Sequence, residues 1–267
     1  MRISWKAAIF ILLFVLFIYV SFTAKPVLPI RLAGSTAFQP FAEKLAEKYM
    51  EEHPSITVDV QGGGSAVGIM ASQQGIVDIG MADMLSLPHD IDYLERTVVA
   101  RDGIAVIVNP ANKANEISFD QLGKIFSGEI NNWKDVSFDN APIRVISREE
   151  GSGTKKSFDQ LVLNGKKLTR EAMFQDSNGT IRETVRSDPN AIGYISIGYL
   201  TSNVKPLLID GIAATNENVK AGIYKISRPI FLILKANPKD AARKFLNYLL
   251  EAEAQKIIAS DGLIPVK

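Results

Sequence analysis

The chain has 267 residues, a formal net charge of +1, no cysteine and two histidines, and 46% of its residues are hydrophobic. This length suits two modest domains, and the hydrophobic fraction supports packed cores and excludes a largely disordered chain. The lack of cysteine excludes disulfides, thiolate metal sites and a thiol nucleophile, and the near-neutral charge argues against nucleic-acid binding. His53 and His89 are too few and too far apart to predict a multi-histidine metal site or a catalytic triad.

The first 25 residues, Met1 to Lys25, form a segment of their own. A short basic stretch precedes sixteen residues without a charge, Ala7 to Phe22. This pattern is typical of a secretory signal, and it is nearly as long as a membrane anchor, which needs about 17 to 25 residues. No clean Ala-x-Ala cleavage site follows, so a cleaved signal and an uncleaved anchor both stay open. Either one predicts export, with the membrane contacted only through this segment. The segment carries three basic residues and no acid, so the remainder of the chain has a net charge of −2.

From Pro29 onward, short apolar strands alternate with segments whose apolar residues recur at helical spacing. The alternation predicts an α/β protein, with the middle of the chain forming one lobe and both ends forming the other. Strands are predicted at 30–33, 56–60, 77–80, 98–108, 143–147, 191–196 and 224–235. Helices are predicted at 38–52, 65–74, 119–126, 240–250 and 252–260, and in the segment that follows Thr154.

Three short turns rich in glycine and serine each connect a predicted strand to a predicted helix, at 34–37, 62–66 and 150–154. A helix N-terminus has free backbone N–H groups and a partial positive charge, and glycine lets a ligand approach the backbone closely. Each turn is therefore suited to an oxyanion. Serine, threonine and glycine are also ordinary helix caps, so a single turn carries little weight. Three of them predict a site for a tetrahedral anion if they converge.

Two charged residues follow predicted strands near these turns. Arg148 could form a bidentate pair with an oxyanion, or alternatively a surface salt bridge with a neighbouring glutamate. Asp83 lies where α/β folds place their ligands, or alternatively caps a helix that begins before Leu85. A buried carboxylate needs a hydrogen-bond donor, which protonated phosphate offers and sulfate at neutral pH does not. Asp83 therefore predicts selection of phosphate over sulfate.

These segments resemble the phosphate-binding proteins of ABC phosphate transporters, which have the type II periplasmic-binding-protein fold. The similarity covers Ile30 to Val266 and depends on several motifs in the family's order. They are Ala33-Gly34-Ser35-Thr36, Gln61 to Ser65, Ile79 to Asp83, Ile125 to Trp133, Ser147 to Thr154, Pro189 to Tyr194 and Gly262 to Pro265.

The resemblance implies two α/β lobes that close on one dehydrated phosphate. Residues 28–105 with 225–267 would form lobe 1 and residues 106–224 lobe 2, joined by two crossing segments with the cleft between them. The implied phosphate-binding residues are Ser35, Thr36, Ala37, Ser65, Asp83, Arg148, Ser152, Gly153 and Thr154. Gly64 and Glu150 are expected to support them, with Glu150 holding the arginine where some relatives have aspartate.

The resemblance also implies a non-enzymatic monomer without catalytic residues, metal or cofactor. It would pass inorganic phosphate to the transmembrane subunits of an ABC permease, at the outer face of the cytoplasmic membrane, in the periplasm or outside the cell. Three alternatives stay open: a binding protein for sulfate, molybdate or a phosphate ester; a secreted phosphatase-type hydrolase using Ser65 or Ser152; and a surface signalling protein that uses phosphate as a cue. The hydrolase lacks an evident base, because neither histidine is well placed.

Overall fold

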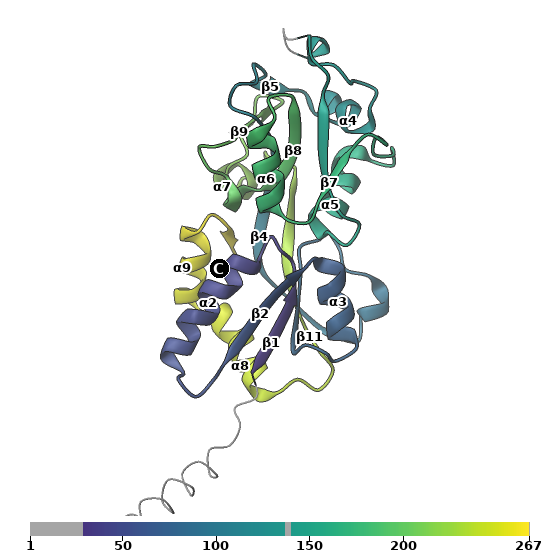
Figure 1. Ribbon diagram of the computed structural model, residues 1–267. Helices are drawn as coiled ribbons and strands as arrows, with labels where there is room; N and C mark the ends of the chain where they lie inside the picture. Colours follow the sequence, from purple (N-terminus) through teal and green to yellow (C-terminus); the bar gives the residue numbers. More distant parts are fainter. Residues whose placement is uncertain (1–28, 137–139, 267) are drawn as a thin grey trace, which may run out of the picture.

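The computed structural model describes residues 29–136 and 140–266, so the predicted leader, Met1 to Lys25, lies outside the described residues. Figure 1 shows two halves stacked one on the other, with the strands β4 and β11 running between them. Among the described residues, no helix is both long and apolar enough to cross a membrane.

The first half, lower in Figure 1, has a parallel three-stranded unit at one edge of its sheet, in the order β2-β1-β3. Helices α2, α8 and α9 pack on one face of this sheet and α3 lies on the other (Figure 1). The strands are β1 (Ile30–Gly34), β2 (Val58–Gly63) and β3 (Ile79–Ala82). The helices are α2 (Gln39–Glu52), α3 (Ser65–Gln73), α8 (Asp240–Leu249) and α9 (Ala252–Ser260).

The second half contains the strands β6, β7 and β8, of which β6 pairs in parallel with both of the others. Its core includes the fully buried Trp133 and the stacked rings of Phe158 and Tyr194, whose centroids are 4.0 Å apart. The strands are β6 (Arg144–Arg148), β7 (Met173–Gln175) and β8 (Ala191–Ser196). The helices are α4 (Phe119–Ser127), α5 (Gly153–Phe158), α6 (Asn178–Ser187) and α7 (Asn216–Lys220). Short strands complete this half and its border: β5 (Glu116–Ile117), β9 (Lys205–Pro206), β10 (Leu208–Ile209) and β12 (Ile264–Pro265).

Two long antiparallel strands connect the halves: β4 (Glu95–Val108) and β11 (Ser227–Leu234). On β4 the core of the first half ends at Ala100 and the core of the second begins at Ile104. Asp102 lies between the two cores and is directly opposite Arg228 of β11 in the strand register. The connection between the halves therefore carries a buried pair of opposite charges at its midpoint.

The long predicted elements lie where the sequence placed them, because their apolar periodicity reports which face is buried. The helices α6 and α7 and the strand β7 were not predicted. In β7 two of three residues are exposed, so this strand has no buried apolar pattern for a sequence analysis to detect.

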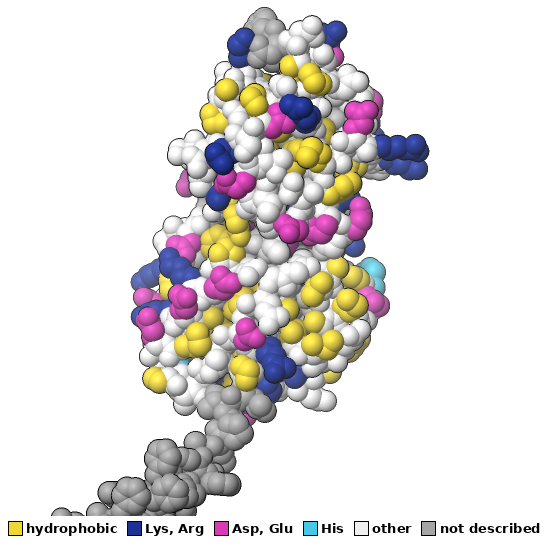
Figure 2. Space-filling view, in the orientation of Figure 1, with side chains coloured by type: hydrophobic (Ala, Val, Ile, Leu, Met, Phe, Trp, Pro, Cys, Tyr) yellow, Lys and Arg dark blue, Asp and Glu magenta, His cyan; other side chains and the backbone are white. Residues whose placement is uncertain are grey.

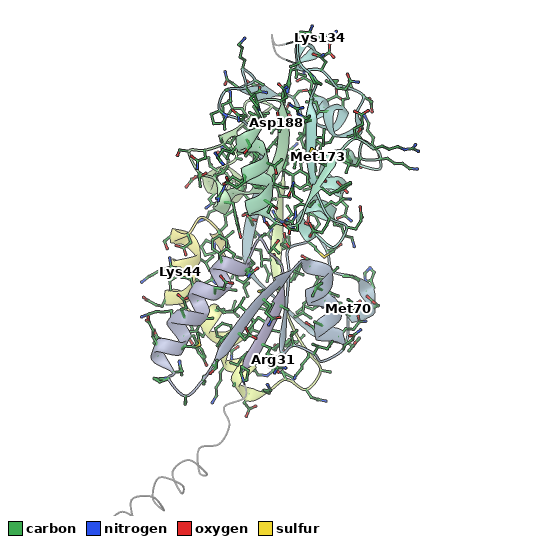
Figure 3. The ribbon with its side chains drawn as sticks, in the orientation of Figure 1. Arg31, Lys44, Met70, Lys134, Met173 and Asp188 are labelled. Atoms are coloured by element: carbon green, nitrogen blue, oxygen red, sulfur yellow. The ribbon has the colours of Figure 1, made fainter. Side chains whose placement is uncertain are left out.

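The surface differs between the flanks of the molecule and the border between its halves. Figure 2 shows acidic side chains gathered along this border on the face in view. Met70 on α3 and Met173 on β7, labelled in Figure 3, are 51% and 47% exposed on the two halves. On the face in view, the border between the halves is therefore marked by acidic side chains.

Candidate functional site

The three Gly/Ser turns converge at the border between the halves. The Ala66 N–H, from the second turn, donates to the Gly151 carbonyl of the third at 3.1 Å. A Cβ atom on Gly64, which has a φ of +88°, would lie 2.8 Å from the same carbonyl oxygen. A Cβ atom on Gly153 would lie 2.2 Å from the Ser65 hydroxyl oxygen. Glycine at 64 and 153 thus allows the two halves to meet backbone to backbone.

The convergence encloses the residues that the sequence singled out. Thr36 is partly buried, and the other eight predicted ligands are buried. These eight are Ser35, Ala37, Ser65, Asp83, Arg148, Ser152, Gly153 and Thr154. Polar groups withdrawn from water in this way interact strongly with one another and with any ligand between them.

Two of the serines act as caps through their hydroxyl oxygens, and the Ser35 hydroxyl also donates to Asp83. The Ser35 hydroxyl accepts a hydrogen bond from the Phe38 N–H at 3.1 Å, and the Ser152 hydroxyl accepts one from the Lys155 N–H at 3.2 Å. A serine hydroxyl can accept and donate at once, so capping and ligand binding are compatible. Gly153 begins α5, and the first N–H groups of a helix have no acceptor inside it. The turn therefore presents neutral donors at a helix N-terminus.

Arg148 ends β6 and is held on several sides. Its Nη2 donates to the Thr36 hydroxyl in the other half and to the Asp176 carbonyl, both at 3.0 Å. Nε and Nη2 form two parallel bonds of 2.9 Å to the Glu149 carboxylate. Nη1 is buried and has no hydrogen-bond partner among the described residues. The guanidinium is fixed in place with one nitrogen still able to bind an acceptor.

The expectation that Glu150 holds this arginine is wrong, because Glu149 holds it. Glu149 directly follows Arg148 and reaches it with both carboxylate oxygens. Glu150 lies one residue further into the turn, with its side chain 86% exposed, and pairs with Lys155 at 3.1 Å. The salt bridge with a neighbouring glutamate and the burial of Arg148 therefore occur together, although the sequence analysis treated them as alternatives.

Asp83 follows β3 and lies at the centre of the contacts between the halves. It begins no helix, so the alternative of a helix cap is wrong. One carboxylate oxygen accepts from the Ser65 hydroxyl at 2.7 Å, and the other accepts from the Thr154 hydroxyl at 2.7 Å. The second oxygen also accepts from Arg228 Nη2 at 2.8 Å and Nε at 3.1 Å. Burial raises the pKa of Asp83, but the charge of Arg228 and the two hydroxyl donors outweigh burial and hold this pKa below its usual value.

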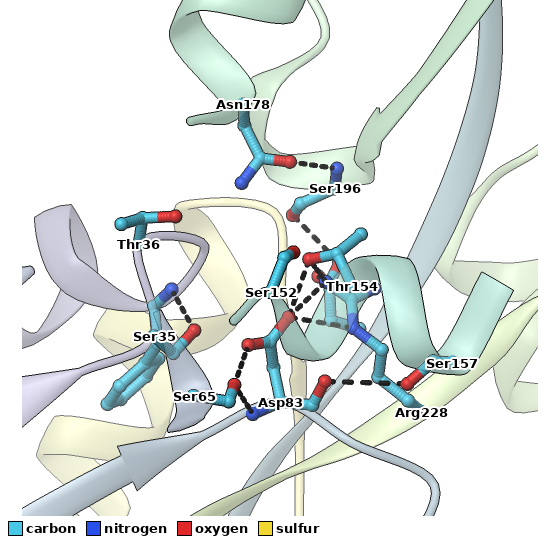
Figure 4. Close-up of polar contacts among 12 residues, drawn as sticks. Ser35, Thr36, Ser65, Asp83, Ser152, Thr154, Ser157, Asn178, Ser196 and Arg228 are labelled. Carbon is cyan, nitrogen blue, oxygen red and sulfur yellow. Dashed lines mark hydrogen bonds and ion pairs between the residues drawn. The ribbon is translucent and has the colours of Figure 1, made fainter. Parts of the chain in front are cut away.

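Arg228 is a residue of this site that sequence reasoning missed. Besides Asp83, it pairs with Asp102 at 3.0 Å. It also donates to the Thr154 hydroxyl at 3.0 Å (Figure 4). Burial raises the pKa of Asp102 to about 6, although the charge of Arg228 and a hydrogen bond from Ser196 oppose the rise. The sequence held one signal for Arg228, which is that a charged residue interrupts the apolar run 224–235.

This arrangement can bind a small anion without changing its covalent bonds. It offers hydroxyl and backbone donors from both halves, one guanidinium and one ionised acceptor. Within residues 29–136 and 140–266, no group of three or more histidine, aspartate or glutamate side chains is placed to hold a metal ion.

Two α/β halves around a buried, donor-rich border define a two-lobed solute-binding protein, and comparison with known proteins identifies the family. Residues 21–253 match the family model described as the PBP superfamily domain. The phosphate-binding protein PstS of Bacillus subtilis is 37% identical over 240 residues, which cover 88% of this chain and 80% of that protein. A PstS of Borreliella burgdorferi is 28% identical over 253 residues, 89% of this chain and 90% of that protein.

Solved structures agree with the sequence relatives. A Clostridium perfringens structure with bound phosphate, assigned to phosphate ABC transporter substrate-binding proteins, has a TM-score of 0.86 and 36% identity. The match covers 90% of this chain and all of that one. A Vibrio cholerae ABC-type phosphate transport receptor has a TM-score of 0.74 and 32% identity, covering 88% and 99% of the two chains. The chain therefore belongs to the PstS family of phosphate-binding proteins, and the predicted resemblance and periplasmic-binding-protein fold are confirmed.

Proposed function

We propose that this protein binds inorganic phosphate between its two halves and delivers it to the transmembrane subunits of an ABC phosphate permease, without catalysing a reaction. The observation that carries the proposal is the convergence of three Gly/Ser turns on Arg148, whose Nη1 is buried without a partner. Family membership supports it, because the Bacillus relative is named a phosphate-binding protein and the Clostridium structure contains phosphate.

Donors from both halves surround the anion in this proposal. The first half contributes the Thr36 hydroxyl and backbone N–H groups of the turn 34–37 and of Ser65. The second half contributes Arg148 and the turn that begins α5. A charged donor such as the guanidinium makes shorter and stronger hydrogen bonds than neutral groups do, and Arg148 offers its free Nη1 for this purpose.

Asp83 supplies the selectivity. Its low pKa keeps it ionised near neutral pH, so it can accept a hydrogen bond but cannot donate one. Phosphate keeps a proton at neutral pH and satisfies this acceptor, whereas sulfate would place oxygen against oxygen. Two anionic oxygens brought together without a proton between them repel each other, and this repulsion disfavours sulfate.

Entry and release of phosphate require the halves to separate. We place the hinge in β4 and β11, between the two hydrophobic cores, with residues 28–105 and 225–267 moving against 106–224. The contacts Arg148–Thr36 and Thr154–Asp83 cross this border and would break on opening. The Tyr199 hydroxyl, which donates to the Thr36 carbonyl at 2.8 Å, would separate as well.

The place of action is outside the cytoplasm, as for the extracytoplasmic receptors of this family. Residues 1–25 would export the chain and either stay as an anchor or be removed. In the anchored form the binding halves would remain at the outer face of the membrane, close to a permease.

Calorimetric titration of the full chain in detergent tests the proposal. We expect micromolar or tighter binding of phosphate, at least 100-fold weaker binding of sulfate and molybdate, and no hydrolysis of a chromogenic phosphomonoester. Equal affinity for sulfate would favour a general oxyanion receptor, and turnover of the ester would favour a hydrolase. Phosphate-dependent co-purification with permease subunits separates transport from signalling, because a sensor alone would not associate with them.

A further inference from the structure

A second buried donor lies at the start of α6, outside the nine residues predicted to bind phosphate. Asn178, the first residue of α6, has no exposed surface. Its side-chain Oδ1 accepts a hydrogen bond from the Ser196 backbone N–H at 3.0 Å. Its Nδ2 is buried and has no hydrogen-bond partner among the described residues. A buried amide nitrogen without a partner costs free energy, so its presence requires an explanation.

The orientation of this amide is determined by its neighbour. A backbone N–H can only donate, so the atom facing Ser196 must be the oxygen, and the nitrogen must face the other way. In Figure 4 the nitrogen of Asn178 is turned toward the space bounded by Thr36 and Ser152. The assignment of oxygen and nitrogen therefore directs the free donor toward the border between the halves.

The strand register places this donor at the anion site. Strands β6 and β8 are parallel, with Arg144 opposite Ala191, so Arg148 and Ser196 end the two strands at the same edge of the sheet. Ligands of open α/β sheets bind at this carboxyl edge. The Asp176 carbonyl, two residues before Asn178, accepts from Arg148 Nη2 at 3.0 Å. Asn178 is thus linked to the arginine on one side and to the end of β8 on the other.

We propose that the side-chain NH₂ group of Asn178 is a further phosphate ligand, which donates from the start of α6 beside Arg148. The inference rests on the proposed phosphate-binding function. It explains why Arg148 Nη1 and Asn178 Nδ2 are both buried without partners, since one anion between them satisfies both. A second cation would attract every anion. A neutral donor adds a directed hydrogen bond instead, so it favours an anion of the right shape.

The substitution Asn178→Asp isolates the donor. The carboxylate keeps an oxygen for the Ser196 N–H, replaces the NH₂ group and adds a negative charge, so a donor toward the anion becomes a repelling acceptor. We expect the phosphate affinity of the full chain to fall at least tenfold at pH 7.5. Asn131→Asp adds the same charge at an exposed position of the same half and should bind within twofold of the unaltered chain. As the pH is lowered, the carboxyl group of the Asn178→Asp variant regains a proton to donate. The difference in phosphate affinity between this variant and the unaltered chain should therefore become smaller.

Asn178→Asp binding within twofold of the unaltered chain would overturn the inference, provided that the unaltered chain binds phosphate. Failure of the unaltered chain to bind phosphate would instead overturn the proposed function. NMR of the unaltered chain gives an answer even where the variant does not fold. The side-chain NH₂ resonances of Asn178 should shift on addition of phosphate and not of sulfate, and resonances that stay in place would also overturn the inference.

Discussion

Arg228 of β11 and Asp83, which follows β3, form a buried ion pair in which two guanidinium nitrogens contact one carboxylate oxygen at 2.8 and 3.1 Å. Arg228 lies between the two cores on a strand that connects the halves, and it also pairs with Asp102 on the other connecting strand. The candidate acceptor of the phosphate proton is thus tied directly to the connection between the halves. A movement of β11 against β4 would change the surroundings of Asp83, so one side chain would couple the proposed hinge to the proposed ligand site.

The first prediction concerns this pair. Arg228→Gln leaves two buried carboxylates without their cation, and breaking a buried pair from one side costs about 3–5 kcal/mol. We expect urea unfolding without phosphate to show a loss of that order. Arg243→Gln is the control, because it removes an ion pair with Glu95 whose side chains are 48% and 45% exposed. Such exposed pairs are worth about 0–1 kcal/mol. Equal losses in the two variants would show that Arg228 is not a structural centre.

The second prediction tests which glutamate holds Arg148. Glu149→Ala removes two charge-assisted hydrogen bonds of a buried guanidinium and should lower the free energy of unfolding by about 1–3 kcal/mol. Glu150→Ala removes an exposed partner of Lys155 and should lower it by less than about 1 kcal/mol. Urea unfolding of both variants without phosphate measures the difference. A larger loss for Glu150→Ala would restore the expectation drawn from the sequence.

The third prediction concerns the arginine itself. Arg148→Ala removes the only cation proposed to contact the anion, and we expect phosphate affinity to fall by a factor of ten or more in calorimetry. Arg144→Ala is the matched control at the other end of the same strand, where the arginine pairs with Asp188 near the surface. The phosphate affinity of the Arg144→Ala variant should equal that of the unaltered chain. Unchanged affinity of the Arg148 variant would remove this residue from the site.

The fourth prediction concerns selectivity. Asp83→Asn replaces a charged acceptor by a neutral side chain that can also donate, so sulfate no longer meets an ionised carboxylate. We expect the ratio of phosphate to sulfate affinity to fall by at least tenfold, measured by competition titration at pH 8. A variant that rejects sulfate as strongly as the unaltered chain would refute the acceptor role of Asp83.

The fifth prediction concerns pH. The pKa of Asp102 is about 6 in the folded protein because of burial, against about 4 in an unfolded chain. The folded state therefore binds more protons between pH 4 and 6, and the contribution of this group to stability falls as the pH rises through that window. The loss should reach about 3 kcal/mol. Asp83 has a lowered pKa and acts with the opposite sign, since its contribution is lost as the pH falls below about 4.

Urea unfolding of the unaltered chain and of Asp102→Asn at several pH values between 4 and 7 tests this assignment. The substitution removes the titrating group, so the stability of the variant should depend less steeply on pH in this window. Parallel pH profiles would show that Asp102 does not titrate there.

The sequence by itself determined the long elements and the character of the site. Apolar periodicity reports the buried face of a helix or strand, and a Gly/Ser turn before a helix creates an anion-binding N-terminus from local geometry alone. Asn178 shows the limit of this reasoning. The stretch Ser177-Asn178-Gly179-Thr180 combines serine, glycine and threonine as the turns at 34–37 and 150–154 do. The strand before it is short and mostly exposed, so no apolar pattern marked it.

Only the tertiary structure decided which of these groups meet. Arg228 is 145 residues from Asp83, and Thr154 is 71 residues from it, so no local pattern can pair them. Arg148 pairs with Glu149 and not with Glu150, and this likewise depends on which of the two side chains turns inward at the end of β6. Local sequence sets backbone conformation within a few residues, whereas burial and charge pairing depend on how distant segments pack. The candidate donors could therefore be proposed residue by residue, while their convergence, and the ion pair between Asp83 and the connecting strand β11, came from the fold.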